Sequence, residues 1–75
     1  MAEASPATLG TRIRAARLAL GLTQTELAAA LGMPQSAVSG LETGRYLGDS
    51  PALATLIRVA RALDVSADHL LGLGD

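Results

Sequence analysis

Between residues 35 and 43 the sequence carries polar side chains at a spacing that places them on one side of a helix. The members of this set are Gln35, Ser36, Ser39, Gly40 and Thr43. Their amides and hydroxyls both donate and accept hydrogen bonds, and none of them is charged. Glutamine can bond adenine through two atoms, and serine can bond to a donor or an acceptor, so the pattern suits the reading of base edges.

Gly40 is the unusual member of this set. A glycine inside a helix costs about 1 kcal/mol relative to alanine. On the outer face it would let the helix backbone approach DNA closely or leave room for a thymine methyl group. The alternative is that the position makes no contact.

Other kinds of chemistry find little support in the sequence. The chain has no cysteine, so it has neither a disulfide nor a thiolate metal site. Its single histidine, His69, is expected at the surface rather than in a catalytic or metal site. Nucleophile–base pairs, paired carboxylates and phosphate-binding glycine loops are missing from the pattern. We therefore expect no enzyme, no cofactor and no metal.

Length and composition predict one all-α domain over residues 1–75, with a core at about 6–72. The chain is 49 % hydrophobic and has one aromatic residue, Tyr46. Alanine, leucine and arginine, which are plentiful here, favour helices. The sequence has neither an apolar run of about 18 residues nor a signal peptide, so a cytoplasmic location on the nucleoid is expected, with no membrane contact.

The charge is unevenly distributed along the chain. The net charge of −1 argues by itself against a polyanionic partner. Residues 10–46, however, hold four arginines and two glutamates, whereas residues 47–75 hold two arginines and four aspartates. The first part of the chain is therefore the better candidate for contact with phosphates.

Caps and apolar spacing predict five helices. Residues that match N-terminal caps or first-turn prolines are Ser5, Pro6, Thr23, Glu26, Pro34, Ser50, Pro51 and Ser66. Residues expected to end helices are Gly21, Gly32, Gly44 and Gly72. Residues 45–50 form the only sizeable loop. Apolar residues expected to face inward include Leu20 on the first helix and Leu53, Leu56, Ile57, Ala60 and Leu63 on the fourth.

This arrangement resembles the helix-turn-helix of the phage Cro and repressor family, also called the xenobiotic-response-element family. The matching residues are Gln24, Leu27, Ala28, Gly32, Val38 and Leu41, with the segments TQTELA, LETG and ARALDVSADHLLG. The resemblance covers roughly residues 9–72, with the helix-turn-helix at 24–43. It implies a compact five-helix, lambda-repressor-like DNA-binding domain.

The resemblance also implies roles for individual residues. Gln24 would contact phosphate, Gln35 and Ser36 would read bases, and Ser39 would contact a base or a phosphate. Thr43, Arg45 and Tyr46 would contact the DNA backbone, although Tyr46 could equally pack under the fourth helix. Many relatives carry a groove-facing polar residue where this chain has Gly40, so its specificity would differ from theirs. Arg17 and Glu42 would form a structural pair between the first and third helices.

The expected mechanism is repression of transcription by a homodimer on a palindromic operator, with half-sites about 34 Å apart. A nearly neutral single copy would bind DNA weakly, and two copies would restore affinity. The dimer surface is expected at Leu70, Leu71 and Leu73. Two alternatives stay open: an antitoxin that also binds a small toxin protein, and a protein-binding module of the same fold.

Overall fold

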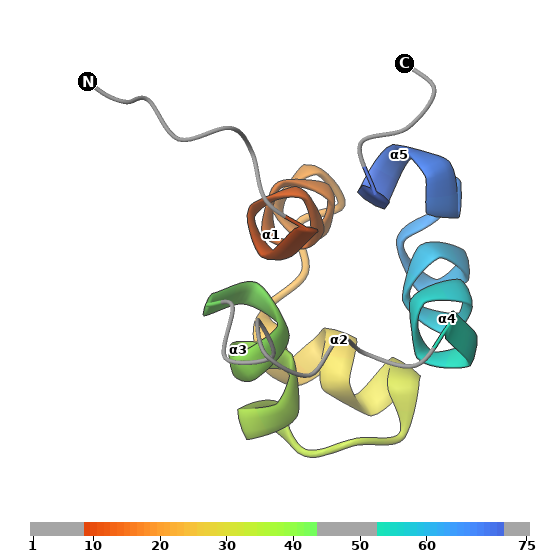
Figure 1. Ribbon diagram of the computed structural model, residues 1–75. Coiled ribbons are helices and arrows are strands. Elements are labelled where there is room, and N and C mark those ends of the chain that lie inside the picture. Colours follow the sequence, from red (N-terminus) through yellow and green to blue (C-terminus); the bar gives the residue numbers. More distant parts are fainter. Residues whose placement is uncertain (1–8, 44–52, 72–75) are drawn as a thin grey trace.

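The computed structural model describes residues 9–43 and 53–71, and within these ranges every regular element is a helix. In chain order the helices are α1 (Leu9–Ala19), α2 (Gln24–Leu31), α3 (Gln35–Thr43), α4 (Leu53–Leu63) and α5 (Ala67–Leu71) (Figure 1). The predicted all-α, five-helix fold is confirmed. None of these helices is long and apolar enough to cross a membrane.

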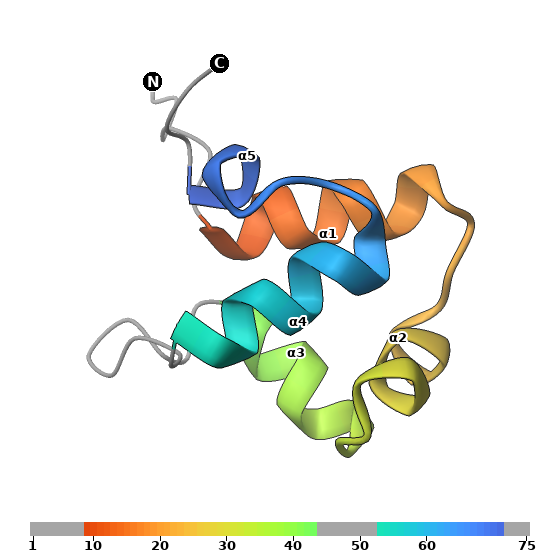
Figure 2. The ribbon, with the colours of Figure 1, turned by 90° about the vertical axis from the view of Figure 1, so that its right-hand side faces the viewer.

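The helix α1 contacts α3, α4 and α5. The pair α2 and α3 packs together at one end, and α5 lies at the opposite end (Figures 1 and 2). The helix α4 touches both α2 and α5 and so joins the two ends. Consequently α3 keeps one side free of other described helices.

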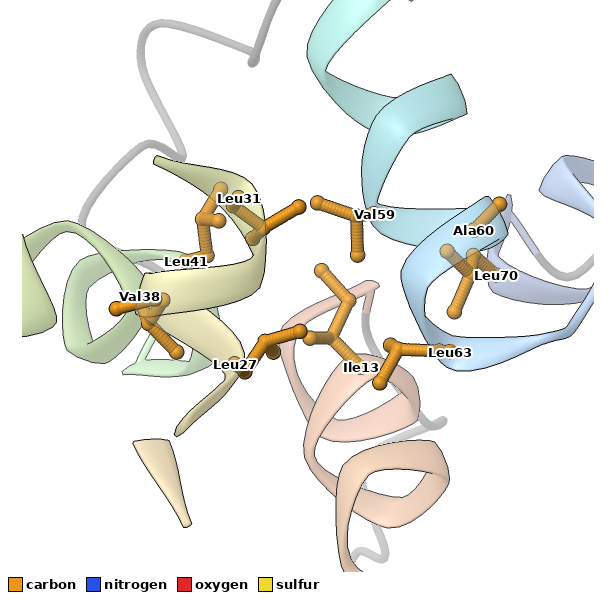
Figure 3. Packing of buried hydrophobic residues seen from close by; sticks show 10 residues of the cluster. Ile13, Leu27, Leu31, Val38, Leu41, Val59, Ala60, Leu63 and Leu70 are labelled. Carbon is orange, nitrogen blue, oxygen red and sulfur yellow. The ribbon is translucent and has the colours of Figure 1, made fainter. Parts of the chain in front are cut away.

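The core is built around Ile13 of α1, which is fully buried. Figure 3 shows Ile13 between the apolar side chains of α2 and α3 on one side and those of α4 and α5 on the other. The buried apolar residues around it are Leu27, Ala28, Leu31, Val38, Leu41, Val59, Ala60, Leu63 and Leu70. Every helix contributes to one cluster, so a chain of this length has a single core.

Three helices end in the same way, with a residue of positive φ one or two positions after the last helical residue. These residues are Gly21 (φ 72°), Gly32 (φ 69°) and Asp64 (φ 58°). In each case the following amide donates to a carbonyl five residues earlier, as in a Schellman motif: Leu22 to Arg17 (3.1 Å), Met33 to Ala28 (3.0 Å) and Val65 to Ala60 (3.0 Å). The predicted ends at Gly21 and Gly32 are confirmed, and Asp64 is an addition.

Two predicted N-terminal caps are also confirmed. The hydroxyl of Thr23 accepts a bond from the amide of Glu26 (3.0 Å), and the Glu26 carboxylate accepts one from the amide of Thr23 (2.8 Å). The hydroxyl of Ser66 accepts a bond from the amide of His69 (3.0 Å). Pro34, predicted to begin the third helix, lies directly before its first residue, Gln35. The remaining predicted caps and ends, at residues 5, 6, 44, 50, 51 and 72, lie outside the described residues.

Three predictions of apolar facing are wrong. Leu20 is 49 % exposed because α1 ends at Ala19 and the following turn leaves the helical repeat. Ile57 is 39 % exposed, since the buried stripe of α4 runs through Val59 instead. Leu70, expected at a dimer surface, is fully buried in the core, so it is not available to a partner.

Candidate nucleic-acid interface

The two sides of α3 differ sharply in polarity. Val38 and Leu41 are buried against the core, and Glu42 is buried beside them. On the other side Gln35, Ser36 and Thr43 are exposed and Ser39 is half-buried. The structure therefore groups four of the predicted contact residues on one outward face.

Gly40 does not belong to this face. It is buried in the folded chain, which corrects the expectation that it lies outward. Glycine has no side chain, and its backbone is covered here, so Gly40 cannot contact a DNA groove.

Arg17 of α1 and Glu42 of α3 form a buried, bidentate ion pair, as the resemblance implied. Arg17 Nε donates to Glu42 Oε2 (2.6 Å) and Arg17 Nη2 donates to Glu42 Oε1 (3.0 Å). The two side chains are only 8 % and 2 % exposed. The third guanidinium nitrogen, Nη1, donates to the carbonyl of Leu22 (2.7 Å). Arg17 therefore connects the C-terminal end of α1 both to α3, through Glu42, and to the turn after α1, through Leu22.

The pair keeps both partners charged. Burial by itself would raise the pKa of Glu42, but hydrogen bonds from Arg17 and Gln24, with the charges of Arg17 and Arg14, lower that pKa below its ordinary value. The hydrogen bond to Glu42 raises the pKa of Arg17 despite the opposing effect of burial. The carboxylate of Glu42 is therefore ionised at neutral pH and can only accept hydrogen bonds.

From this pair, hydrogen bonds lead outward to the exposed face of α3. Gln24 Nε2, at the start of α2, donates to Glu42 Oε1 (3.0 Å). Gln35 Nε2, at the start of α3, donates to Gln24 Oε1 (2.6 Å). The predicted phosphate contact and the predicted base reader are thus bonded to each other, and their shared support is the buried pair.

Comparison with known proteins agrees with this geometry. Residues 13–70 match the helix-turn-helix family. The chain belongs to this family. Its α2 and α3 are the two helices of the motif, and the fold is the DNA-binding helix-turn-helix of transcriptional regulators.

Relatives of the chain are regulators and repressors by name. An HTH-type transcriptional regulator of Methanothermobacter thermautotrophicus is 49 % identical over 53 residues, which are 71 % of this chain and 72 % of the relative. The immunity repressor protein of Bacillus phage phi105 is 37 % identical over 65 residues, 87 % of this chain but only 43 % of that protein. The P22 c2 repressor protein, solved in complex with a synthetic operator, aligns with a TM-score of 0.76 at 33 % identity, over 85 % of this chain and 92 % of that one.

Gly10 is a residue of the helix-turn-helix support that the sequence reasoning missed. A Cβ atom at this position would lie 2.5 Å from the carbonyl oxygen of Glu42 and 2.7 Å from that of Leu41. The first turn of α1 therefore lies directly on the backbone of α3. The sequence does carry a signal, since a glycine inside a predicted helix is costly, but it does not say which neighbour requires it.

Arg58 gives the motif a second support that the sequence reasoning did not identify. From α4, its Nη2 donates to the carbonyl of Leu31, the last residue of α2. A positive charge at a helix C-terminus also interacts favourably with the helix dipole. The turn between α2 and α3 is thereby fixed to α4.

The remaining predicted site residues fall into two groups. Thr43 is exposed, but its hydroxyl already donates to the carbonyl of Ser39 (2.9 Å), which leaves only acceptor capacity for a partner. Arg45, Tyr46 and Leu73 lie outside the described residues.

Proposed function

We propose that this chain binds double-stranded DNA with α3 in the major groove and represses transcription. The observation that carries the proposal is the outward face of α3, formed by Gln35, Ser36, Ser39 and Thr43, which is polar and uncharged. It lies opposite the side that packs on the core. A helix fits the width of the major groove, and side chains of these types can bond to base edges there.

The residues divide by role according to their position. Gln35 and Ser36, in the first turn of α3, are assigned to base edges. Gln24 and Thr43 flank them and are assigned to phosphates, as are Arg45 and Tyr46 beyond the helix. Phosphate contacts of this kind set the register of the protein on the duplex but carry no sequence information.

We further propose that two copies bind a palindromic operator. A net charge of −1 gives one copy little electrostatic attraction to DNA, so a second set of contacts is needed for affinity. With Leu70 buried, the dimer surface is reassigned to Leu71, which is 39 % exposed, together with Leu73. The helix α5 lies at the end of the fold opposite α3, which leaves the reading face open in a dimer formed there (Figure 2).

A second candidate is a protein-binding role, with a small toxin as one possible partner. The end of α1 favours it, because Leu18 and Leu20 are 54 % and 49 % exposed there. Replacing both with lysine would abolish binding of such a partner and leave DNA binding intact. DNA repression and partner binding are compatible in one chain.

The test is a salt series of binding to genomic DNA fragments and to random duplex. We expect one fragment to bind at least tenfold tighter than random DNA, and Gln35→Ala to remove most of that preference, since one bidentate base contact is worth about 1 to 3 kcal/mol. Asp68→Asn, at an exposed first-turn position of α5, serves as the control and should keep the preference. If no fragment binds tighter than random DNA at physiological salt, the proposal is wrong.

A further inference from the structure

A hollow of about 350 Å³ opens between the C-terminal half of α1 and the segment that joins α4 to α5. Three alanines of α1, Ala15, Ala16 and Ala19, line it on one side, and Leu63 and Val65 line it on the other. Pockets that hold small molecules begin at about 300 Å³ and are mostly apolar. The hollow therefore has the size and the walls of a site for a small ligand.

Two polar side chains, those of Asp64 and His69, border these apolar walls. Asp64 is exposed and is the one carboxylate among the described lining residues. The imidazole of His69 accepts one hydrogen bond in its neutral form. Arg17, on the same stretch of α1, does not line the hollow, and its guanidinium is bonded to Glu42 and to the carbonyl of Leu22. The described lining thus offers a negative charge and an acceptor to a ligand.

The backbone adds negative potential at the same place. The helix α1 ends at Ala19 and α4 ends at Leu63, and both of these residues line the hollow. The two helices run in the same direction across Figure 2, so their C-terminal ends lie on the same side of the molecule. Each helix C-terminus carries a partial negative charge. Arg61, in the last turn of α4, is exposed and lies outside the lining, where solvent screens its charge.

We propose that this hollow binds a small amphiphilic cation, in which a short apolar body carries an ammonium group. The apolar body lies on the alanines of α1, and the ammonium faces Asp64 and the two helix ends. An anion of the same shape meets the same negative charges and is repelled. The proposal does not depend on DNA binding, because the described lining shares no residue with the outward face of α3.

The test is an NMR titration of the wild-type protein with hexylammonium, and with hexanol and hexanoate as ligands of the same length but different charge. We expect hexylammonium to bind in the millimolar range, because a ligand this small has few atoms with which to gain affinity. Hexanoate should bind at least about tenfold more weakly, and hexanol should lie between the two. Each methylene removed from hexylammonium should weaken its binding by up to about fourfold. The amide shifts should concentrate at the lining residues.

Two pairs of variants separate charge from shape. Asp64→Asn removes the carboxylate, keeps the size of the side chain and suits the positive φ of 58°, and it should weaken hexylammonium binding by about three- to fivefold. Its control is Asp68→Asn, the same change at an exposed residue outside the lining, which should alter binding by less than about twofold. Ala19→Leu fills the hollow and should abolish binding, whereas Ala30→Leu, at an exposed position of α2, should leave it intact.

Every other outcome overturns the proposal. Equal binding of hexylammonium and hexanoate would reveal an apolar groove that does not select charge. Shifts that persist in Ala19→Leu would put the cation elsewhere on the protein. If the wild type binds no cation but self-associates, and Ala19→Leu breaks that association, the hollow is a contact between two copies. Circular dichroism establishes which variants are folded, and the comparison of the three ligands on the wild type needs no variant.

Discussion

Replacing Gly10 with alanine should destabilise the protein, although the substitution favours helix formation. The added Cβ would lie 2.5 Å from the Glu42 carbonyl oxygen, a separation that real Cβ atoms essentially never show, and ordinary contact begins at 3.4 Å. The first turn of α1 and the last turn of α3 must therefore separate by about 0.9 Å (from 2.5 Å to 3.4 Å). The three atoms closer than 3.0 Å to the added Cβ are all backbone atoms, so no side chain can rotate out of the way.

The size of the effect follows from two opposing contributions. Overpacking of this kind costs about 1 to 3 kcal/mol, while alanine gains up to about 1 kcal/mol over glycine in a helix. Since three backbone atoms lie within 3.0 Å of the added Cβ, we place the overpacking cost at about 2 to 3 kcal/mol, and subtracting about 1 kcal/mol leaves an expected fall in the free energy of unfolding of about 1 to 2 kcal/mol. For a domain of this size that corresponds to a drop of roughly 5 to 15 °C in Tm.

Urea denaturation followed by circular dichroism measures this change. Ala15→Gly is the matched control, because Ala15 is exposed on the same helix and reports the helix-propensity term alone. The control should lose up to about 1 kcal/mol. A Gly10→Ala variant as stable as the wild type, or more stable, would refute the argument, since propensity alone predicts stabilisation.

Three further predictions concern stability. Because the folded-state pKa of Glu42 is lowered, its ion pair should contribute fully above the ordinary pKa near 4.5, and the contribution should be lost as the pH falls through the folded-state pKa. Glu42→Gln should thus cost about 3 to 5 kcal/mol at pH 7, and the difference between its urea midpoint and that of the wild type should narrow as the pH is lowered below about 4.5; a difference that does not narrow on acidification would contradict this. Asp64→Gly should raise the free energy of unfolding by about 0.5 to 1 kcal/mol in thermal melts, since φ is 58° there and a negative charge at a helix C-terminus is unfavourable; a lower Tm would exclude that reasoning. Thr23→Ala should lose about 1 kcal/mol in urea titrations by removing the cap of α2, whereas Thr25→Ala beside it should change little, and equal losses would argue against a specific cap.

The helix boundaries were predictable where a single residue type carries the signal. Gly21 and Gly32 end helices because their positive φ suits glycine, and Thr23 begins one because its hydroxyl and Glu26 satisfy each other's amides. Asp64 performs the same role as the two glycines, but aspartate occurs in many settings. Its position at the end of α4 becomes visible only in the backbone.

Which apolar residues of a helix are buried was less predictable, because more than one set of apolar positions can fit the helical spacing. In α4 both Ile57 and Val59 fit a helical repeat, but Val59 is fully buried in the core and Ile57 is 39 % exposed. The outward face of α3 was predictable from its polar side chains, whereas the burial of Gly40 depends on neighbours that spacing does not reveal. The bonds that Gln24 donates to Glu42 and that Gln35 donates to Gln24 join residues 18 and 11 positions apart, so only the fold brings them together.

The contact at Gly10 has a consequence for how this scaffold can be redesigned. The atoms that α3 offers to α1 at that point are carbonyl oxygens, which every residue type supplies in the same place. The outward side chains of α3 can therefore be replaced without altering the backbone contact by which α3 packs on α1. The same fold is thus suited to exchanging one set of outward residues for another, provided that glycine is kept at position 10 and the Arg17–Glu42 pair is retained.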